Sequence, residues 1–180
     1  GYDWRAIVNH AFINTEGIYG TSVDVAASYI FLFILFGTIM NKCGMGQFFN
    51  DLALAFAGST KGGPAKVAVI ASGLLGSING SAVANVVTTG AFTIPLMKKT
   101  GYSKEFAGAV ESSASVGGQL LPPIMGAAAF IMAEMLGIKY GAIVVSAAIP
   151  ALLYYLGIMV QVQLRANRRN LQGLPKEQLP

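Results

Sequence analysis

The sequence predicts an all-α polytopic membrane protein, in which spanning helices accompany a re-entrant helical hairpin and a discontinuous helix. Three observations favour this fold class. Of the 180 residues, 54% are apolar and only 11% are charged, whereas ordinary soluble domains carry about 25% charged residues. Several long stretches contain no charge, and glycine, serine or proline interrupts two of them. These features indicate a chain that folds within a lipid bilayer.

The charged and reactive residues exclude several functional classes. The net charge of +4 comes from short basic clusters between apolar stretches, which is typical of topology determinants rather than of nucleic-acid binding. Cys43 is the only cysteine and His10 the only histidine, so an internal disulfide and a Cys-rich metal site are excluded. An intramembrane hydrolase using Ser77 or Ser81 would lack a base, because His10 precedes the first apolar stretch. We therefore expect no enzyme, and no cofactor or metal beyond a coupling ion.

The first third of the chain predicts one membrane crossing between two interfacial segments. Residues 1–24 mix aromatic, polar and apolar types and suit a periplasmic or interfacial segment, with Trp4 and Tyr19 at headgroup level. The uncharged run at 25–41 approaches the roughly 20 residues that cross a bilayer, so it predicts a transmembrane helix. Residues 42–66 predict an interfacial helix and loop on the cytoplasmic side.

The segment 67–97 contains 31 residues without a charge. As one straight helix it would be about 46 Å long at ~1.5 Å per residue, against a hydrocarbon core of roughly 30 Å. If it is split at the polar residues Asn79–Ser81, each arm is too short to span alone. Two short arms joined by a polar tip predict a re-entrant hairpin, which enters and leaves on the same side of the membrane.

The distribution of basic residues gives an independent check on this hairpin. If 67–97 returns to its own side, ten Lys and Arg residues lie on one side and two, Arg5 and Lys139, on the other. If 67–97 crossed the membrane once, the basic residues from Lys98 to Lys104 and those at the C-terminus would change sides, and the ten-to-two distribution would be lost. The positive-inside rule therefore favours a hairpin that opens to the cytoplasm. The ten are Lys42, Lys61, Lys66, Lys98, Lys99, Lys104, Arg165, Arg168, Arg169 and Lys176.

The last third predicts a broken helix, an unbroken helix and a tail. The segment 105–137 is too long for one straight crossing, and "GGQLLPP" at 117–123 lies between its two helical parts. Glycine weakens a helical turn and proline lacks the backbone donor, so we interpret the segment as a discontinuous transmembrane helix. Residues 142–164 predict a transmembrane helix, and 165–180 a cytoplasmic tail.

The two breaks predict one shared binding cavity. Non-helical backbone at membrane depth persists only when it is buried in protein or lines a watery cavity. Carbonyl groups at the end of one half-helix suit a cation, and amides at the start of the next suit an anionic group. Small residues also let membrane helices pack closely, and this alternative stays open for each serine. The neutral side chains that suit sodium, a hard cation, are Ser77, Asn79, Ser81, Ser112, Ser113, Ser115 and Gln119.

Glu111 lies several residues inside the second broken segment. A carboxylate within the membrane is costly and marks a functional hypothesis by default. Two readings stay open: a proton or cation site, or a partner for Lys98 or Lys104 near the cytoplasmic surface.

Two long stretches carry a family resemblance. "GSINGSAVANVVTTGAFTIPLMKKTGY" and "FAGAVESSASVGGQLLPPIMGAAAFIMAE" resemble the large membrane subunit of tripartite ATP-independent periplasmic (TRAP) transporters, in particular the fused permeases. The resemblance runs from about Asn9 to Tyr140. It implies half of an inverted-repeat, elevator-type transporter in the cytoplasmic (inner) membrane of a bacterium or archaeon. The second repeat, with its own hairpin, is absent from the sequence, so we interpret the chain as a fragment covering one repeat.

The resemblance also implies function and partners. It implies import of organic acids of the C4-dicarboxylate kind, with sodium as the coupling ion, a periplasmic solute-binding protein and a small membrane subunit or fused small-subunit domain. Proton coupling through Glu111 stays open. We expect Ser81, Ser115 and Gln119, whose neutral side chains lie near the two breaks, to bind the substrate. The implied ion-binding residues are Ser77, Asn79, Gly80, Ser81, Gly117, Gly118 and Pro122.

Two other functions remain as alternatives. One is a different sodium-coupled carrier with re-entrant hairpins, such as a divalent-anion symporter. The other is a non-transporting structural membrane subunit, for which the Ser/Asn tip would tolerate alanine.

Overall fold

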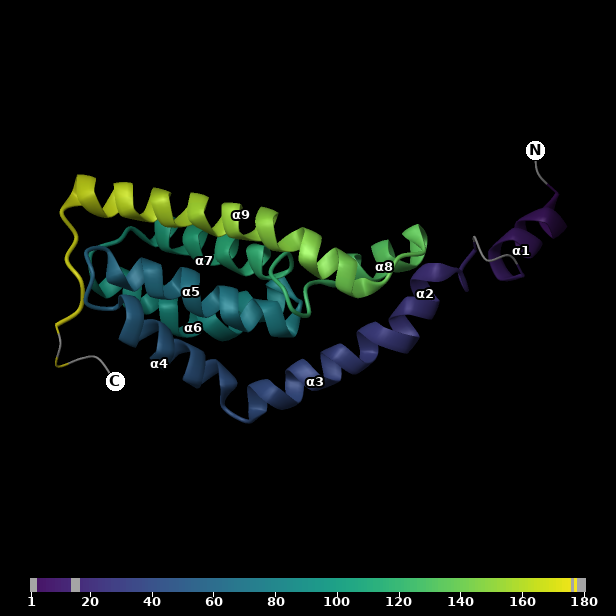
Figure 1. Cartoon of the computed structure of the whole chain (residues 1–180), viewed down its shortest axis with the longest axis horizontal. Helices are drawn as coiled ribbons and strands as arrows, with labels where there is room; N and C mark the ends of the chain where they lie inside the picture. Colours follow the sequence, from purple (N-terminus) through teal and green to yellow (C-terminus); the bar gives the residue numbers. More distant parts are fainter. Residues whose placement is uncertain (1–2, 14–16, 176, 178–180) are drawn as a thin grey trace.

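The computed structural model describes residues 3–13, 17–175 and 177, and every regular element within these ranges is a helix. Figure 1 shows an elongated molecule, in which a short N-terminal helix projects from the body at one end. Lys176, residues 1–2 and 14–16 of the predicted interfacial segment, and 178–180 of the predicted tail lie outside the described residues.

Four elements make up the first part of the chain. After α1 (Trp4–Phe12), the elements α2 (Thr21–Val25), η1 (Ala26–Ile30) and α3 (Phe31–Lys42) join into one helix, Thr21–Lys42. This helix begins four residues before the predicted boundary at 25, because Gly20 is extended and Thr21 already has helical geometry. A turn then leads into α4 (Met45–Ala57), where Gly44 has the positive φ of 92° that glycine adopts readily.

The helix Thr21–Lys42 exposes apolar side chains along most of its length. In α3 only Gly37 is buried, while the side chains of Phe31, Leu32 and Ile34 are each more than half exposed. Such a surface is unfavourable in water. By length and composition, Thr21–Lys42 and the helix Tyr140–Arg169 are long and apolar enough to span a membrane.

The segment predicted as a hairpin is two helices with a break between them. Helix α5 (Gly63–Asn79) ends at Gly80, whose φ is +64°, and α6 (Ala82–Lys99) begins after Ser81, whose hydroxyl accepts a hydrogen bond from the Ala84 amide. The two helices pack against each other. At ~1.5 Å per residue they are about 26 Å and about 27 Å long. The break lies where the sequence predicts it, and re-entry into a membrane stays a prediction.

The second broken segment is also two helices. Helix α7 (Lys104–Gly118) starts at Ser103, whose hydroxyl accepts from the Phe106 amide. An irregular stretch with a cis Pro122–Pro123 bond separates α7 from α8 (Ala127–Leu136). Helix α9 (Tyr140–Arg169) then continues through Pro150 and ends at Asn170. It is longer at both ends than the predicted helix at 142–164, so the predicted tail begins inside it.

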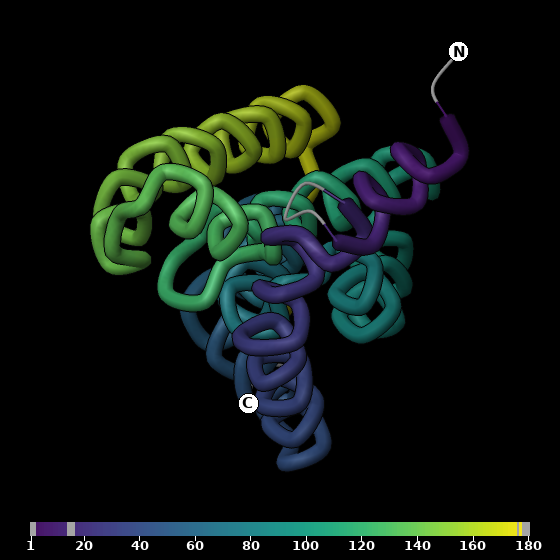
Figure 2. Tube along the Cα trace, turned by 90° about the vertical axis from the view of Figure 1, so that its right-hand side faces the viewer, coloured from purple at the N-terminus to yellow at the C-terminus, as the bar shows by residue number. Residues whose placement is uncertain are grey.

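Helix α5 is the centre of the structure. It contacts α3, α4, α6, α7 and α9, and twelve of its seventeen residues are buried. In Figures 1 and 2, α9 lies on one side of the central helices α5–α7, and α3 on the opposite side. Small residues allow this packing: a Cβ placed on Gly118 of α7 would lie 2.6 Å from the Cα of Gly76 in α5.

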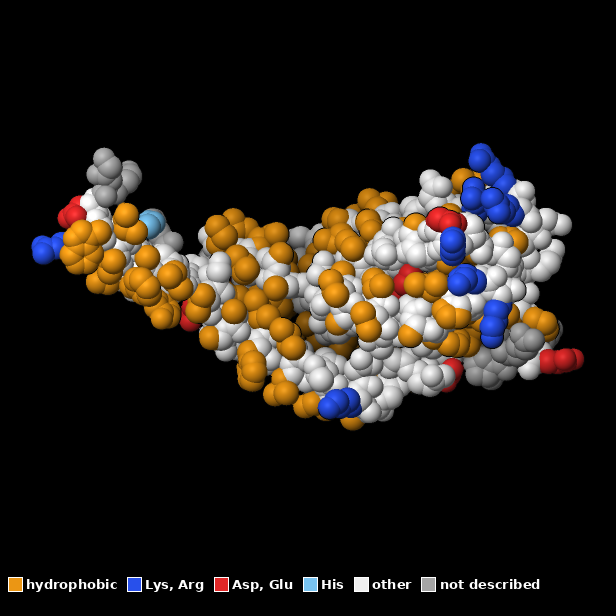
Figure 3. All heavy atoms as spheres, turned by 180° about the vertical axis from the view of Figure 1, so that it is seen from behind, with side chains coloured by type: hydrophobic (Ala, Val, Ile, Leu, Met, Phe, Trp, Pro, Cys, Tyr) orange, Lys and Arg blue, Asp and Glu red, His pale blue; other side chains and the backbone are white. Residues whose placement is uncertain are grey.

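Basic side chains gather at one end of this bundle. Figure 3 shows most Lys and Arg of the visible face at that end, whereas apolar side chains cover much of the remaining face. The loops there touch each other, since the Gly62 amide bonds to the Leu171 carbonyl and the Tyr102 hydroxyl to the Gly62 carbonyl. This grouping agrees with the predicted common side for the basic residues of α6, α7 and α9. The membrane side itself stays a prediction.

Candidate functional site

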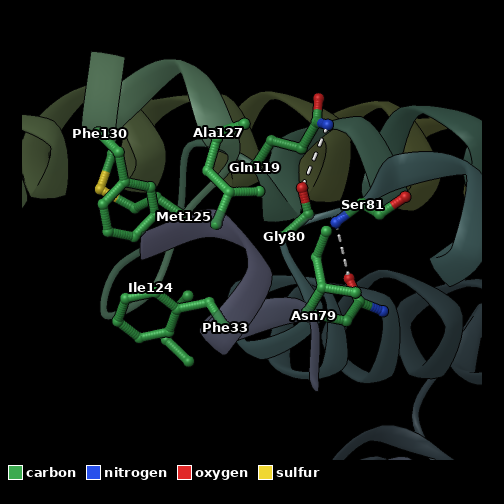
Figure 4. A pocket seen from close by; sticks show the side chains of 11 residues that line it. Phe33, Asn79, Gly80, Ser81, Gln119, Ile124, Met125, Ala127 and Phe130 are labelled. Atoms are coloured by element: carbon green, nitrogen blue, oxygen red, sulfur yellow. Dashed lines mark hydrogen bonds between the residues drawn. The ribbon is translucent and has the colours of Figure 1, made fainter. Parts of the chain in front are cut away.

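The two breaks face one cavity of about 250 Å³. Figure 4 shows its lining: Asn79, Gly80 and Ser81 come from the first break, and Gln119 lies opposite at the second. The other lining residues are apolar and come from η1, α3, α8 and the stretch before α8. They are Ile30, Phe33, Ile34, Ile124, Met125, Ala127 and Phe130. This confirms that the two interruptions share one cavity, as the sequence predicts.

Four helix ends border this cavity. Helix α5 ends beside it at Asn79 and α7 at Gly118, which Gln119 follows. Helices α6 and α8 begin beside it, after Ser81 and at Ala127. C-terminal ends carry partial negative charge and N-terminal ends partial positive charge. The partial negative charges at the ends of α5 and α7 therefore favour a cation in the cavity, and the partial positive charges at the starts of α6 and α8 favour an anion.

Hydrogen bonds across the cavity hold the two breaks together. The Gln119 side-chain amide donates to the Gly80 carbonyl at 3.3 Å, and within the second break the Gly126 amide donates to the Gln119 carbonyl at 2.8 Å. The Ile124 amide donates to the Ser77 carbonyl at 3.1 Å. These bonds satisfy backbone groups that the breaks would otherwise leave unpaired.

The oxygens at the first break are arranged around Asn79. Its Oδ1 accepts from the Ser81 amide at 3.0 Å, in a local turn that asparagine favours. A carbonyl or amide oxygen has two lone pairs, so Asn79 Oδ1 and the Gly80 carbonyl each retain one beyond the bond described. Oxygens of this kind suit sodium.

Five predicted site residues lie away from the cavity lining. The Ser77 hydroxyl donates to the Leu74 carbonyl of its own helix, and Ser115 is fully buried beside Glu111. Gly117 packs under the rings of Tyr154 and Tyr155, and Gly118 packs against Gly76. Their carbonyls already accept hydrogen bonds from the following turn. For both glycines the structure favours the close-packing alternative. Pro122 likewise does not line the cavity.

Glu111 is fully buried, and its hydrogen-bonding partners are hydroxyl groups rather than Lys98 or Lys104. Its Oε1 accepts from Ser72 at 2.6 Å, from Ser115 at 3.2 Å and from Thr89, and its Oε2 accepts from Thr93 at 2.5 Å. These side chains come from α5, α6 and α7, so the carboxylate joins the three central helices.

Most of this hydroxyl cluster, formed by Ser72, Thr89, Thr93 and Ser115 around Glu111, was not predicted from the sequence. Asn85, Thr89 and Thr93 follow one another at intervals of four residues, which places them on one face of α6. A polar stripe of this kind in an uncharged helix was a usable signal. Ser72 gave none, because a single serine in an apolar helix is equally consistent with close packing.

Nearly the whole chain matches one family of known proteins. Residues 2–180 match the family model described as "Tripartite ATP-independent periplasmic transporter, DctM component". The C4-dicarboxylate TRAP transporter large permease protein DctM of Vibrio cholerae is 32% identical over 143 residues, which cover 79% of this chain and 31% of that protein. The protein of the same name from Pseudomonas aeruginosa is 28% identical over 162 residues, covering 90% and 38%.

A third relative carries a different substrate name. The sialic acid TRAP transporter large permease protein SiaM of Vibrio cholerae is 29% identical over 144 residues, covering 80% of this chain and 33% of that protein. The chain thus spans about a third of the length of the curated relatives it matches. Its match to the family model covers nearly every residue. The chain belongs to the DctM family, the large permease components of TRAP transporters, which are membrane transport proteins and not enzymes.

Proposed function

We propose that this chain forms the ion- and solute-binding half of a permease that imports organic acids across a cytoplasmic membrane. The observation that carries the proposal is the cavity where four helix ends meet. The end of α5, with Asn79 and the Gly80 carbonyl, provides oxygens for a dehydrated cation, and the partly negative end of α7 lies beside them. The beginnings of α6 and α8 provide the positive ends that favour an anionic group.

The substrate class rests on charge and on the relatives' names. Two of those names are C4-dicarboxylate and sialic acid, both of which denote organic acids. An anion entering an apolar membrane needs a compensating positive charge, and a cation bound beside it supplies one. We propose sodium as that cation, because the polar groups at the first break are neutral oxygens. Proton coupling is the second candidate, for which Glu111 is the observation in favour.

The remaining parts of the proposal follow from family membership. A periplasmic solute-binding protein delivers the acid, and a small membrane subunit or fused domain accompanies the permease. Helices α5 and α6 form a re-entrant hairpin that moves with α7 as part of an elevator-type transport domain, in a bacterial or archaeal inner membrane. The apolar surfaces of α3 and α9 support contact with the lipid bilayer.

Two alternative functions compete with this proposal: a divalent-anion symporter and a structural membrane subunit. A divalent-anion symporter is disfavoured by the match of residues 2–180 to the DctM family. A structural membrane subunit would not depend on the chemistry of the cavity lining. Substitution at the cavity therefore separates a transport role from a structural one.

The test is sodium-driven solute uptake by the full-length transporter reconstituted in proteoliposomes. Asn79→Ala or Ser81→Ala removes an oxygen at the first break, and each is expected to lower uptake by about tenfold or more, since a loss of about 1.4 kcal/mol in ion binding is tenfold. Thr38→Ala is the matched control, because its hydroxyl is exposed on α3 and bonds only within that helix. Wild-type uptake by both cavity variants, at equal expression, would refute the ion-site assignment.

A further inference from the structure

Glu111 forms a second polar site, which is ionisable and does not line the cavity. Its side chain is 0% exposed, and no ion pair of the carboxylate occurs within the part of the chain that the structure describes. Burying an ionised carboxylate without a cation is costly, and such groups are held by hydrogen bonds or take up a proton. The four surrounding hydroxyls determine how well each state is accommodated.

The hydroxyl cluster accommodates both protonation states. A hydroxyl has one hydrogen and can also accept. Besides the carboxylate, the Thr89 hydroxyl lies 2.8 Å from the Asn85 carbonyl, and the Thr93 hydroxyl lies 3.0 Å from the Thr89 carbonyl. Around ionised Glu111, both hydroxyls point at the carboxylate. Around protonated Glu111, one of them accepts the acid hydrogen and turns its own toward its helix carbonyl. The heavy atoms need not move.

A chain of hydrogen bonds connects Glu111 with the cavity. The Asn79 amide donates to Asn85 Oδ1 at 3.2 Å, the Asn85 amide donates to Ser115 Oγ at 3.0 Å, and Ser115 donates to Glu111 Oε1 at 3.2 Å. The chain begins at a residue that lines the cavity and ends at the buried carboxylate. Each of its three bonds donates toward Glu111.

The direction of this chain is fixed by main-chain groups at both asparagines. Asn85 Nδ2 also donates to the Ser72 carbonyl at 2.9 Å, and a carbonyl can only accept. Asn79 Oδ1 accepts from the Ser81 amide at 3.0 Å, and an amide N–H can only donate. Neither side-chain amide can be reversed without losing one of these bonds.

Negative charge on Glu111 therefore acts on the cavity. Hydrogen bonds in a chain polarise one another, so an ionised carboxylate draws the amide hydrogens toward itself and raises the electron density on Asn79 Oδ1. That oxygen then becomes a better ligand for a cation. Protonation of Glu111 removes this polarisation and the Coulomb attraction between carboxylate and cation.

We propose that Glu111 is a proton site linked to the cation site: a cation bound at Asn79 releases a proton from Glu111 to solvent, and protonation of Glu111 weakens cation binding. The proposal rests on the proposed function, since it needs a cation at the cavity. The linkage is reciprocal by thermodynamic necessity. Helices α5 and α6 face the carboxylate with Ser72, Thr89 and Thr93. The titratable group near it on α9 is Tyr155, whose hydroxyl donates to the Ala114 carbonyl at 2.7 Å.

The test is isothermal titration of the intact, purified transporter with sodium chloride, in two buffers of equal pH and different heats of ionisation. The difference in heat counts the protons released per sodium bound. Wild type is expected to release up to one proton, and its sodium affinity is expected to fall by up to about tenfold per unit decrease in pH. Glu111→Gln keeps a neutral hydrogen-bonding side chain of the same length. It is expected to bind sodium without proton release and independently of pH.

A second variant and a second measurement keep the test decisive. Asn85→Leu cuts the chain and leaves Glu111 with its four hydroxyls, so the pH dependence of sodium affinity is expected to shrink. In wild type, an infrared difference spectrum is expected to show the C=O band of a carboxylic acid, which sodium removes. Equal proton release by wild type and Glu111→Gln, or a band that sodium leaves unchanged, would overturn the linkage alone. Absence of sodium binding in wild type would overturn the proposed function as well.

Discussion

The central helices α5, α6 and α7 carry two polar sites: an open one, the cavity at the helix breaks, and a closed one, the buried hydroxyl cluster around Glu111. The cavity at the helix breaks is bordered by four helix ends, and Asn79 Oδ1 and the Gly80 carbonyl each retain a free lone pair there. The Glu111 cluster lies within unbroken helix, and each oxygen of its carboxylate is already hydrogen-bonded. The open site has the capacity to bind a ligand, whereas the closed one has the capacity to hold or release a proton. One hydrogen-bonded chain through Asn85 and Ser115 connects them.

The largest expected effect comes from the contact that supports both sites. In Gly118→Ala, the new Cβ would lie 2.6 Å from the Cα of Gly76, so α5 and α7 must separate. Because the new Cβ would meet main-chain atoms of Gly76, which no side-chain rotation can move away, we expect destabilisation of about 3 kcal/mol. The measurement is the free energy of unfolding in detergent, together with the yield of folded protein in the membrane.

Gly108→Ala is the matched control for this substitution. It lies on the same helix, α7, and a Cβ there meets nothing within 4 Å. It is expected to leave stability unchanged or to raise it by up to about 1 kcal/mol through helix propensity. Equal stability of the two variants would show that the close approach of α5 and α7 is not needed.

A smaller effect is expected from a change confined to the closed site. Thr93→Val keeps the shape of the side chain and removes the hydroxyl that bonds Glu111 Oε2 at 2.5 Å. We expect a loss of about 1 kcal/mol in the free energy of unfolding. Thr38→Val, on the exposed face of α3, is the control. If both variants lost the same amount, the hydroxyl cluster would have no special role in stability.

The open and closed sites also differ in how far the sequence predicts them. Local chemistry predicts the breaks, because Gly80 adopts a positive φ and prolines end the helical pattern after Gly118. The closed site depends on which helix faces meet. Asn85, Thr89 and Thr93 give a stripe on α6, but nothing local specifies that Ser72 and Glu111 lie opposite it.

Element boundaries and the roles of single residues are what local sequence patterns specify least. The last helix continues to Arg169 rather than 164, because the residue that caps it in a left-handed conformation is Asn170. Ser115 shows the limit for site residues. Its neutral hydroxyl near the second break predicts a role in substrate binding, whereas in the structure that hydroxyl bonds to Glu111 at 3.2 Å and the residue is 0% exposed.

The most direct test of the account is the membrane side of the two ends of the α5–α6 pair. Lys61 and Lys98 are exposed near those ends, and Lys139 is exposed before α9. Single cysteines at these positions, in full-length protein carrying Cys43→Ser, are treated with an impermeant maleimide in sealed vesicles of known orientation. The account predicts that cysteines at 61 and 98 react from the same side and that cysteine at 139 reacts from the opposite side. Reaction of 61 and 98 from opposite sides would contradict it.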